Sequence, residues 1–138
     1  MDALLTWPLA GRPARSPWRL VAAAGAITEA ISHLPLLMSS LSDTPYIGVG
    51  FLLLAVAGFL LALLFVVNDT PAVWVSAAVV ATLALIGYIL SRTTGLPDFT
   101  EYKGDWSYPL GVVSIVGEAM MIAAALLHVA GSARRAGR

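Results

Sequence analysis

The amino-acid sequence predicts an all-α, polytopic membrane protein whose four transmembrane helices form an antiparallel bundle. Hydrophobic residues make up 59% of the chain and charged residues only 12%, with a mean hydropathy of +0.84. A soluble domain carries about 25% charged residues, so this chain lacks the polar side chains that a water-exposed surface needs. Four apolar runs also reach the roughly 20 residues that a helix needs to cross the hydrocarbon core.

We expect one transmembrane domain over residues 1–138, with its helices near residues 18–38, 46–67, 71–90 and 108–130. The second run is the clearest, because no polar side chain occurs between Phe51 and Val67. Lipid offers the backbone no hydrogen-bond partner, so each run must be a helix. Short links between the first three runs require neighbouring helices to be antiparallel, and residues 91–107 form the one long loop.

Prolines and glycines mark the expected helix ends. A capping hydroxyl stands before a proline, the usual start signal of a helix, at Ser16, Thr44 and Thr70. Pro35 lies late in the first run, where we expect it to kink or end the helix. Gly95 and Gly131 follow the third and fourth runs, where a helix end favours glycine.

The basic residues predict the orientation. Six of them flank the two chain ends: Arg12, Arg15, Arg19, Arg134, Arg135 and Arg138. Only Arg92 and Lys103 lie at the opposite end of the bundle. The positive-inside rule therefore predicts a multi-pass protein of the cell membrane with both termini in the cytoplasm and the 91–107 loop outside.

Composition excludes several kinds of chemistry. The chain has no cysteine, which removes thiol catalysis, iron–sulfur clusters and cysteine-based zinc sites. The single lysine, Lys103, lies in a polar segment, so no amine is placed for a Schiff base within the membrane. A net charge of zero gives no reason to expect nucleic acid as a partner. No cofactor is evident, although a divalent metal remains possible.

Four ionisable residues lie within the apolar runs: Glu29, His33, Glu118 and His128. Such residues are rare in lipid and normally face the bundle interior or a cavity. Glu29 and Glu118 each lie about ten residues from the start of their helix, which places both near the bilayer midplane. His128 lies close to the cytoplasmic arginines, where an interfacial side chain is the simpler interpretation.

Small and polar residues recur at helical spacing on three of the runs and predict an outward-opening polar pocket between them. The first run has Gly25, Glu29, Ser32 and His33, and the fourth has Gly111, Ser114, Glu118 and Met121. The third has Ala77, Ala81, Ala84, Tyr88 and Ser91, followed by Arg92. In the second run, by contrast, we expect the large apolar side chains to contact lipid: Phe51, Leu54, Leu61 and Phe65.

The favoured function is binding or transport of a cation, a proton or a small polar ligand. The candidate ligand-binding residues are Glu29, His33, Tyr88, Arg92, Ser114 and Glu118. A carboxylate–imidazole set of Glu29, His33 and Glu118 would also suit a divalent metal. The simpler alternative is that each glutamate is protonated and hydrogen-bonded to a neighbouring helix, while Arg92 anchors the outer surface.

Two other functions stay open. The chain can be a non-catalytic membrane subunit whose small-residue faces dock a partner protein or a second copy. It can also be a membrane enzyme acting on lipid or quinone, although no nucleophile–base pair supports this.

The long loop and its flanks carry a recurring combination: residues 91–97 (SRTTGLP), Trp106, residues 109–111 (PLG) and Glu118. It resembles a combination found in small uncharacterised bacterial four-helix membrane proteins. That resemblance implies a membrane location and no particular activity. The architecture is also similar to small multidrug exporters, which place one glutamate mid-membrane in their first helix. The second glutamate, the long loop and the charge bias depart from that pattern, so export is not implied.

Overall fold

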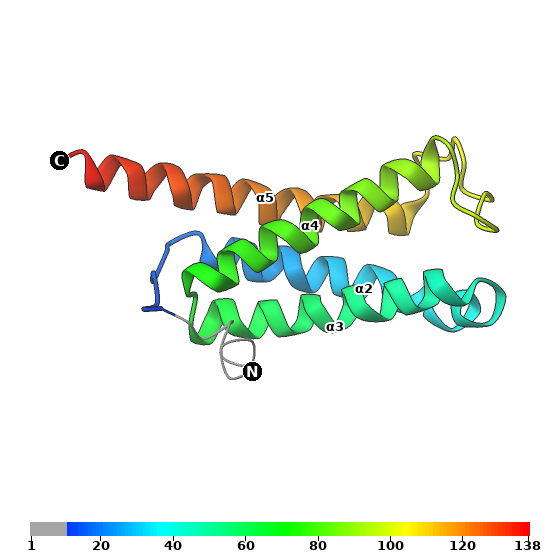
Figure 1. Ribbon diagram of the computed structural model, residues 1–138, viewed down its shortest axis with the longest axis horizontal. Helices are drawn as coiled ribbons and strands as arrows, with labels where there is room; N and C mark the ends of the chain where they lie inside the picture. The colour runs from blue at the N-terminus through cyan, green and yellow to red at the C-terminus, as the bar shows by residue number, and fades with distance from the viewer. Residues whose placement is uncertain (1–10) are drawn as a thin grey trace.

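The computed structural model describes residues 11–138 and contains four long helices packed as an antiparallel bundle (Figure 1). The helices are α2 (Arg19–Asp43), α3 (Pro45–Val67), α4 (Pro71–Arg92) and α5 (Pro109–Ala136). Each is long and apolar enough to cross a membrane. The predicted all-α four-helix bundle is therefore confirmed, and the chain is a multi-pass membrane protein.

The helix starts follow the proline signals more closely than the capping signals. Proline occupies the first position of α3, α4 and α5. The Thr70 hydroxyl accepts a hydrogen bond from the Val73 amide at 3.4 Å, as predicted. The Thr44 hydroxyl instead donates to the carbonyl of Asp98 at 3.2 Å, which ties the α2–α3 link to the long loop. The expected cap at Thr44 is therefore wrong.

Two helices are longer than predicted. Pro35 lies inside α2, and the helix continues to Asp43 with only Thr44 as its link to α3. Tight packing of Leu41 against Gly48 of α3 supports this last turn. Likewise α5 continues past Gly131 to Ala136, so neither Pro35 nor Gly131 ends its helix. Gly95 does follow α4 with a φ of +77°, as its glycine identity indicates.

The apolar core lies in the half of the bundle nearest the chain termini. α2 packs most extensively against α3 and α5, while α4 packs mainly on α5. The core contains small residues and a few large ones: Ala22, Ala23, Ala26, Leu61, Ala62, Phe65, Val73, Trp74, Ala77, Ala81, Met121 and Ala124. Leu61 and Phe65 were expected to contact lipid, and that expectation is wrong. Because α3 is apolar on every side, its sequence does not reveal which face packs.

α3 and α4 are close together at one end and apart at the other (Figure 1). α3 ends and α4 begins at the link of residues 68–70, where the two helices lie side by side. Here the rings of Phe65 and Trp74 pack edge to face with centroids 4.8 Å apart. From there they diverge toward the end of the bundle that carries residues 93–108. We call this the loop end and the opposite end, where the C-terminus lies, the terminal end.

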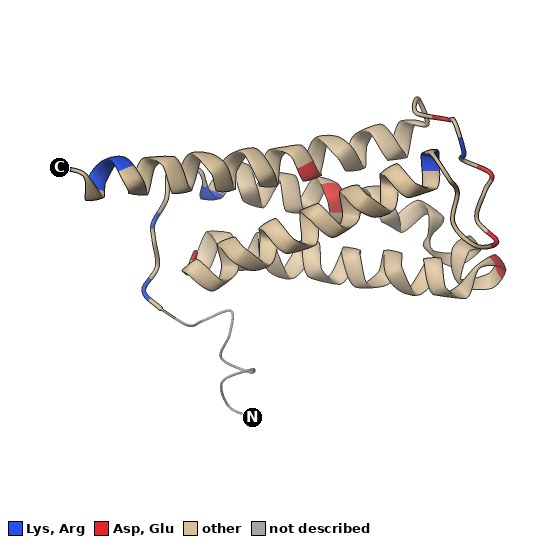
Figure 2. Ribbon diagram, turned by 45° about the horizontal axis from the view of Figure 1, so that its top comes forward, with Lys and Arg blue, Asp and Glu red and all other residues tan. Residues whose placement is uncertain are grey.

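Asp69 fastens the terminal end. Its carboxylate accepts hydrogen bonds from the amides of Arg15 at 2.8 Å and Ser16 at 2.9 Å, and from the Trp74 indole at 3.4 Å. The segment before α2 is thereby held against the α3–α4 link. Figure 2 shows basic residues at both ends of the bundle and acidic ones at its middle as well as its ends.

Candidate functional site

α2 and α5 cross so closely that their backbones touch. A Cβ atom built on Gly25 would lie 2.6 Å from the carbonyl oxygen of Gly117, and one built on Gly117 would lie 2.8 Å from the amide nitrogen of Glu29. No side chain fits at either position, so glycine is required at both. Glu29 is one turn along α2 from Gly25, and Glu118 directly follows Gly117. The crossing therefore brings the two glutamates to the same level.

Both glutamates are fully buried, with Glu29 0% and Glu118 1% exposed. The Ser114 hydroxyl donates to Oε1 of Glu118 at 2.8 Å. Oε2 of Glu118 and both carboxyl oxygens of Glu29 have no hydrogen-bond partner among the described residues. The Glu29 backbone lies against Gly117, the residue before Glu118, so both glutamates belong to one helix contact. The site is thus two buried carboxyl groups at one helix crossing, with three oxygens that have no partner in the described structure.

Polar side chains lie one helical turn from this pair, toward the loop end. The Ser32 hydroxyl donates to the Glu29 carbonyl at 2.6 Å and lies 3.3 Å from Nδ1 of His33. Nδ1 of His33 is also 2.8 Å from the Glu29 carbonyl oxygen. Ser32, His33 and Ser114 all line the cavity described next, so they lie between the glutamates and that cavity.

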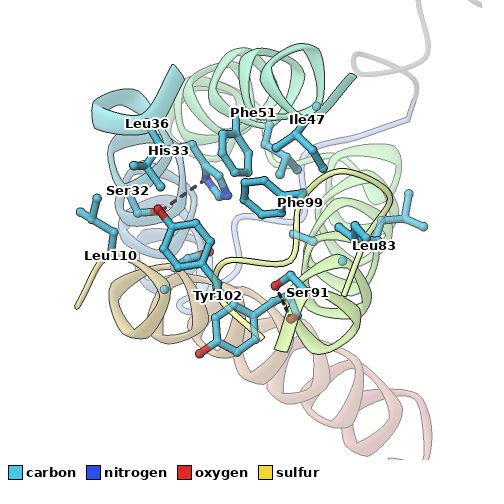
Figure 3. A pocket seen from close by; sticks show the side chains of 18 of the residues that line it. Ser32, His33, Leu36, Ile47, Phe51, Leu83, Ser91, Phe99, Tyr102 and Leu110 are labelled. Atoms are coloured by element: carbon cyan, nitrogen blue, oxygen red, sulfur yellow. Dashed lines mark hydrogen bonds between the residues drawn. The ribbon is translucent and has the colours of Figure 1, made fainter. Parts of the chain in front are cut away.

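A cavity of about 510 Å³ fills the space between the diverging helices. All four helices and residues 93–108 contribute to its mostly apolar wall. Figure 3 shows the rings of His33, Phe51 and Phe99 next to one another, with Leu83 and Ser91 across the cavity from His33. The His33 and Phe51 ring centroids are 5.0 Å apart. Leu53 and Leu83 also belong to this wall, yet both are more than 60% exposed, so the cavity reaches the lipid-facing surface.

Arg92 lies at the loop end of the cavity and is only 6% exposed. Its guanidinium carbon stacks 4.4 Å above the Tyr88 ring and 5.1 Å from the Tyr102 ring. Nη1 donates to the Ser91 hydroxyl at 2.9 Å, while Nε has no partner among the described residues. Arg92 is therefore a buried cation held by neutral groups.

Residues 93–108 fold over the loop end. The backbone amide of Gly104 donates to the Arg92 carbonyl at 2.8 Å, and the Tyr46 hydroxyl donates to the Pro97 carbonyl at 2.6 Å. Phe99 is buried. Burial, followed by the neighbouring hydroxyl of Tyr108, raises the pKa of Tyr102 to about 12. This segment is thus a packed cover that places two aromatic rings, Phe99 and Tyr102, against the cavity.

The six residues predicted from sequence occupy two layers. His33, Tyr88, Arg92 and Ser114 line the cavity, whereas Glu29 and Glu118 lie beneath it. α3 also forms part of the cavity wall, although the predicted pocket involved only the other three helices. Among residues 11–138, no three His, Cys, Asp or Glu side chains come together to hold a metal ion. Glu29, His33 and Glu118 are therefore not gathered into one such group, and a metal site at these residues stays a prediction.

Sequence reasoning missed two features. Gly50 and Gly87 line the cavity from α3 and α4, and a Cβ atom on either would meet nothing within 4 Å. A glycine within a long apolar run does not indicate from sequence whether the space beside it is filled or open. At the terminal end, His128 stacks on Trp74 with ring centroids 4.4 Å apart, and no spacing in the sequence connected them.

Comparisons with protein-family descriptions, with curated proteins and with solved structures find no match to this chain.

Proposed function

We propose that this membrane protein binds a proton between Glu29 and Glu118 and exchanges it with the loop end of the bundle. The observation that carries the proposal is the set of three carboxyl oxygens that are buried without a hydrogen-bond partner in the described structure. Two ionised carboxylates side by side in lipid would be prohibitively costly. A proton held by the pair removes one charge and supplies a donor for one of the unused oxygens.

A protonated glutamate that only joins helices would give its hydroxyl a fixed acceptor across the helix interface. Outside the pair itself, Glu29 has no such acceptor among the described residues, because neither of its carboxyl oxygens has a hydrogen-bond partner. A group left unsatisfied in this way is expensive and is typical of functional positions. This favours a proton-binding role over a purely structural one.

The surroundings favour exchange in one direction. Toward the loop end, Ser114 hydrogen-bonds the Glu118 carboxyl group and lines the cavity, and Ser32 and His33 line the cavity beside the Glu29 backbone carbonyl. Toward the terminal end, the apolar core closes the bundle with fully buried residues such as Ala26 and Met121. Hydroxyl and imidazole groups can pass protons, whereas alkyl side chains cannot. A proton therefore reaches the pair from the cavity side.

Infrared spectroscopy of the protein in lipid tests the protonation directly. A carboxylic acid carbonyl band should be present at neutral pH and should change when the pH is raised. Glu29→Gln and Glu118→Gln should each remove that response, while Glu101→Gln, at an exposed loop position, should leave it intact. A carboxylic acid band that ignores pH would establish the structural role instead. If only carboxylate bands are present and Na⁺ or K⁺ shifts them, the pair binds a metal cation instead of a proton.

Proton flux tests whether binding leads to transport. Proteoliposomes with an imposed pH gradient and an internal pH-sensitive dye should show flux with the unaltered protein and with Glu101→Gln. The variant carrying both Glu29→Gln and Glu118→Gln should fall to the level of empty liposomes. Flux that survives this double substitution would contradict a transport role for the pair.

A further inference from the structure

The cavity at the loop end has an opening toward lipid. Its two long walls belong to α3 and α4, which diverge toward this end (Figure 1). Gly50 and Gly87 leave open space on these walls, and the wall residues Leu53 and Leu83 are 63% and 62% exposed. A molecule dissolved in the bilayer can therefore enter between α3 and α4 without crossing water.

Almost the whole wall is apolar, which suits a hydrocarbon body. Leu36, Leu54 and Ala57 line the cavity along with the two glycines. About 510 Å³ lies within the range of cavities that enclose small-molecule ligands, roughly 300–1,000 Å³. The lining residues between Gly50 and Ala57 on α3 and between Val80 and Gly87 on α4 offer no hydrogen-bonding side chain that would select a polar ligand.

One end of the cavity has the opposite character. Arg92 is 6% exposed, and its guanidinium contacts the rings of Tyr88 and Tyr102 and the hydroxyl of Ser91. None of these groups carries a negative charge, and Nε has no partner in the described structure. A guanidinium has five donors in a fork that matches carboxylate and phosphate oxygens. A buried cation without a counter-charge attracts an anion.

We propose that this cavity binds an amphipathic anion from the bilayer, with its acidic head at Arg92 and its hydrocarbon chain between α3 and α4. The head is a carboxylate or a phosphate, and the tail is a single alkyl chain. The proposal is independent of proton binding at Glu29 and Glu118, because it depends on Arg92 and on the shape of the α3–α4 opening.

Photo-crosslinking in lipid nanodiscs tests the site. The probe is a long-chain fatty acid that carries a diazirine on its alkyl chain, and its matched control is the corresponding fatty alcohol. The acid should label peptides of α3 and α4 near Gly50 and Gly87 at least tenfold more than the alcohol does. Equal labelling by acid and alcohol would overturn the requirement for an anion.

Variants separate the head from the tail. Arg92→Gln should reduce labelling by the acid about tenfold, whereas Lys103→Gln, which removes an exposed positive charge at the same end of the bundle, should not. Gly87→Leu fills the cavity while leaving Arg92 in place, and it should also abolish labelling. Gly131→Leu is its control, because a Cβ atom at that position likewise meets nothing within 4 Å, but outside the cavity. Labelling that persists in Gly87→Leu would refute the site.

Competition identifies the head group. Unlabelled fatty acid and a lysophospholipid with a terminal phosphate should each displace the probe, and the stronger competitor identifies the acid that Arg92 prefers. Displacement by neither anion would overturn the proposal. In all these experiments, a thermal unfolding curve for each variant shows that the variant is folded.

Discussion

The helix pairs α2–α5 and α3–α4 both contain glycines, yet they use them in opposite ways. At the α2–α5 crossing, Gly25 and Gly117 allow backbone to touch backbone, and this contact buries the glutamates. In the α3–α4 pair, Gly50 and Gly87 face open space and widen a cavity. A glycine in a membrane helix can therefore mean close contact or its absence, and only the position of the neighbouring helix decides which.

Substitution of these glycines should separate the two pairs most strongly. Gly25→Leu should destabilise the protein by about 3 kcal/mol or more, because its side chain would meet the α5 backbone, which cannot move aside. Gly87→Ala should be neutral or stabilise by about 0.5–1 kcal/mol, since alanine favours the helix and clashes with nothing. Unfolding by denaturant in mixed micelles measures both. Equal effects would show that the two pairs pack alike.

The closed and open ends of the α3–α4 pair should differ as well. Phe65 is 0% exposed and packs on Trp74, so Phe65→Ala should lower the free energy of unfolding by about 2 kcal/mol. This is less than the roughly 3–5 kcal/mol typical of water-soluble cores, because in lipid only the packing contribution is lost and not the transfer from water. Phe51 lies beside the cavity and is only half-buried, so Phe51→Ala should cost clearly less. The same unfolding measurement applies. A larger loss for Phe51 would mean that the loop end is the better packed one.

Asp69 provides a third contrast, because it fastens the closed end. Asp69→Ala removes the acceptor of two backbone amides and should cost about 1.5 kcal/mol. The segment of residues 11–17 should then become sensitive to limited trypsin digestion after Arg15. Asp105→Ala, at the loop end, is the control and should leave that digestion unchanged. Unaltered resistance in Asp69→Ala would contradict the fastening role.

The smallest effect should appear at the cover of the cavity. The pKa of Tyr102 is raised from 10.0 to about 12, so its neutral phenol is favoured in the folded protein. The resulting stability is fully present below pH 10 and is lost as the pH rises through 12. Tyrosinate absorbance should therefore show a component that titrates near pH 12 and is missing in Tyr102→Phe. Unchanged titration in that variant would assign the component to another tyrosine.

The helix count and the inward stripes were predictable because lipid imposes simple rules. Twenty apolar residues must be helical, and a costly carboxyl group must face inward. Glu29, Ser114 and Glu118 are accordingly buried, as are the predicted stripe alanines Ala77, Ala81 and Ala84 of α4. The packed face of α3 was not predictable, because its apolar residues surround the helix and no periodicity distinguishes Leu61 or Phe65 from a lipid-facing neighbour.

The candidate site was likewise predictable only in part. Each ionisable residue could be identified from its rarity within an apolar run, but its neighbours could not. The crossing of α2 and α5 decides that the two glutamates meet, and the divergence of α3 from α4 decides that Arg92 faces a cavity. Both depend on contacts between residues far apart in the chain. Local spacing in the sequence carries no record of them.

The order of the helices along the chain has a consequence for biosynthesis. Of the four described helices, the first to be synthesised carries Glu29 and the last carries Glu118. α2 and α3 are joined by Thr44 alone and so can enter the bilayer as a helical hairpin. During that interval the Glu29 carboxyl group has no α5 beside it, and the nascent hairpin carries it as an exposed polar group. Docking of α5 is therefore the step that encloses Glu29, and it follows the synthesis of the other three described helices.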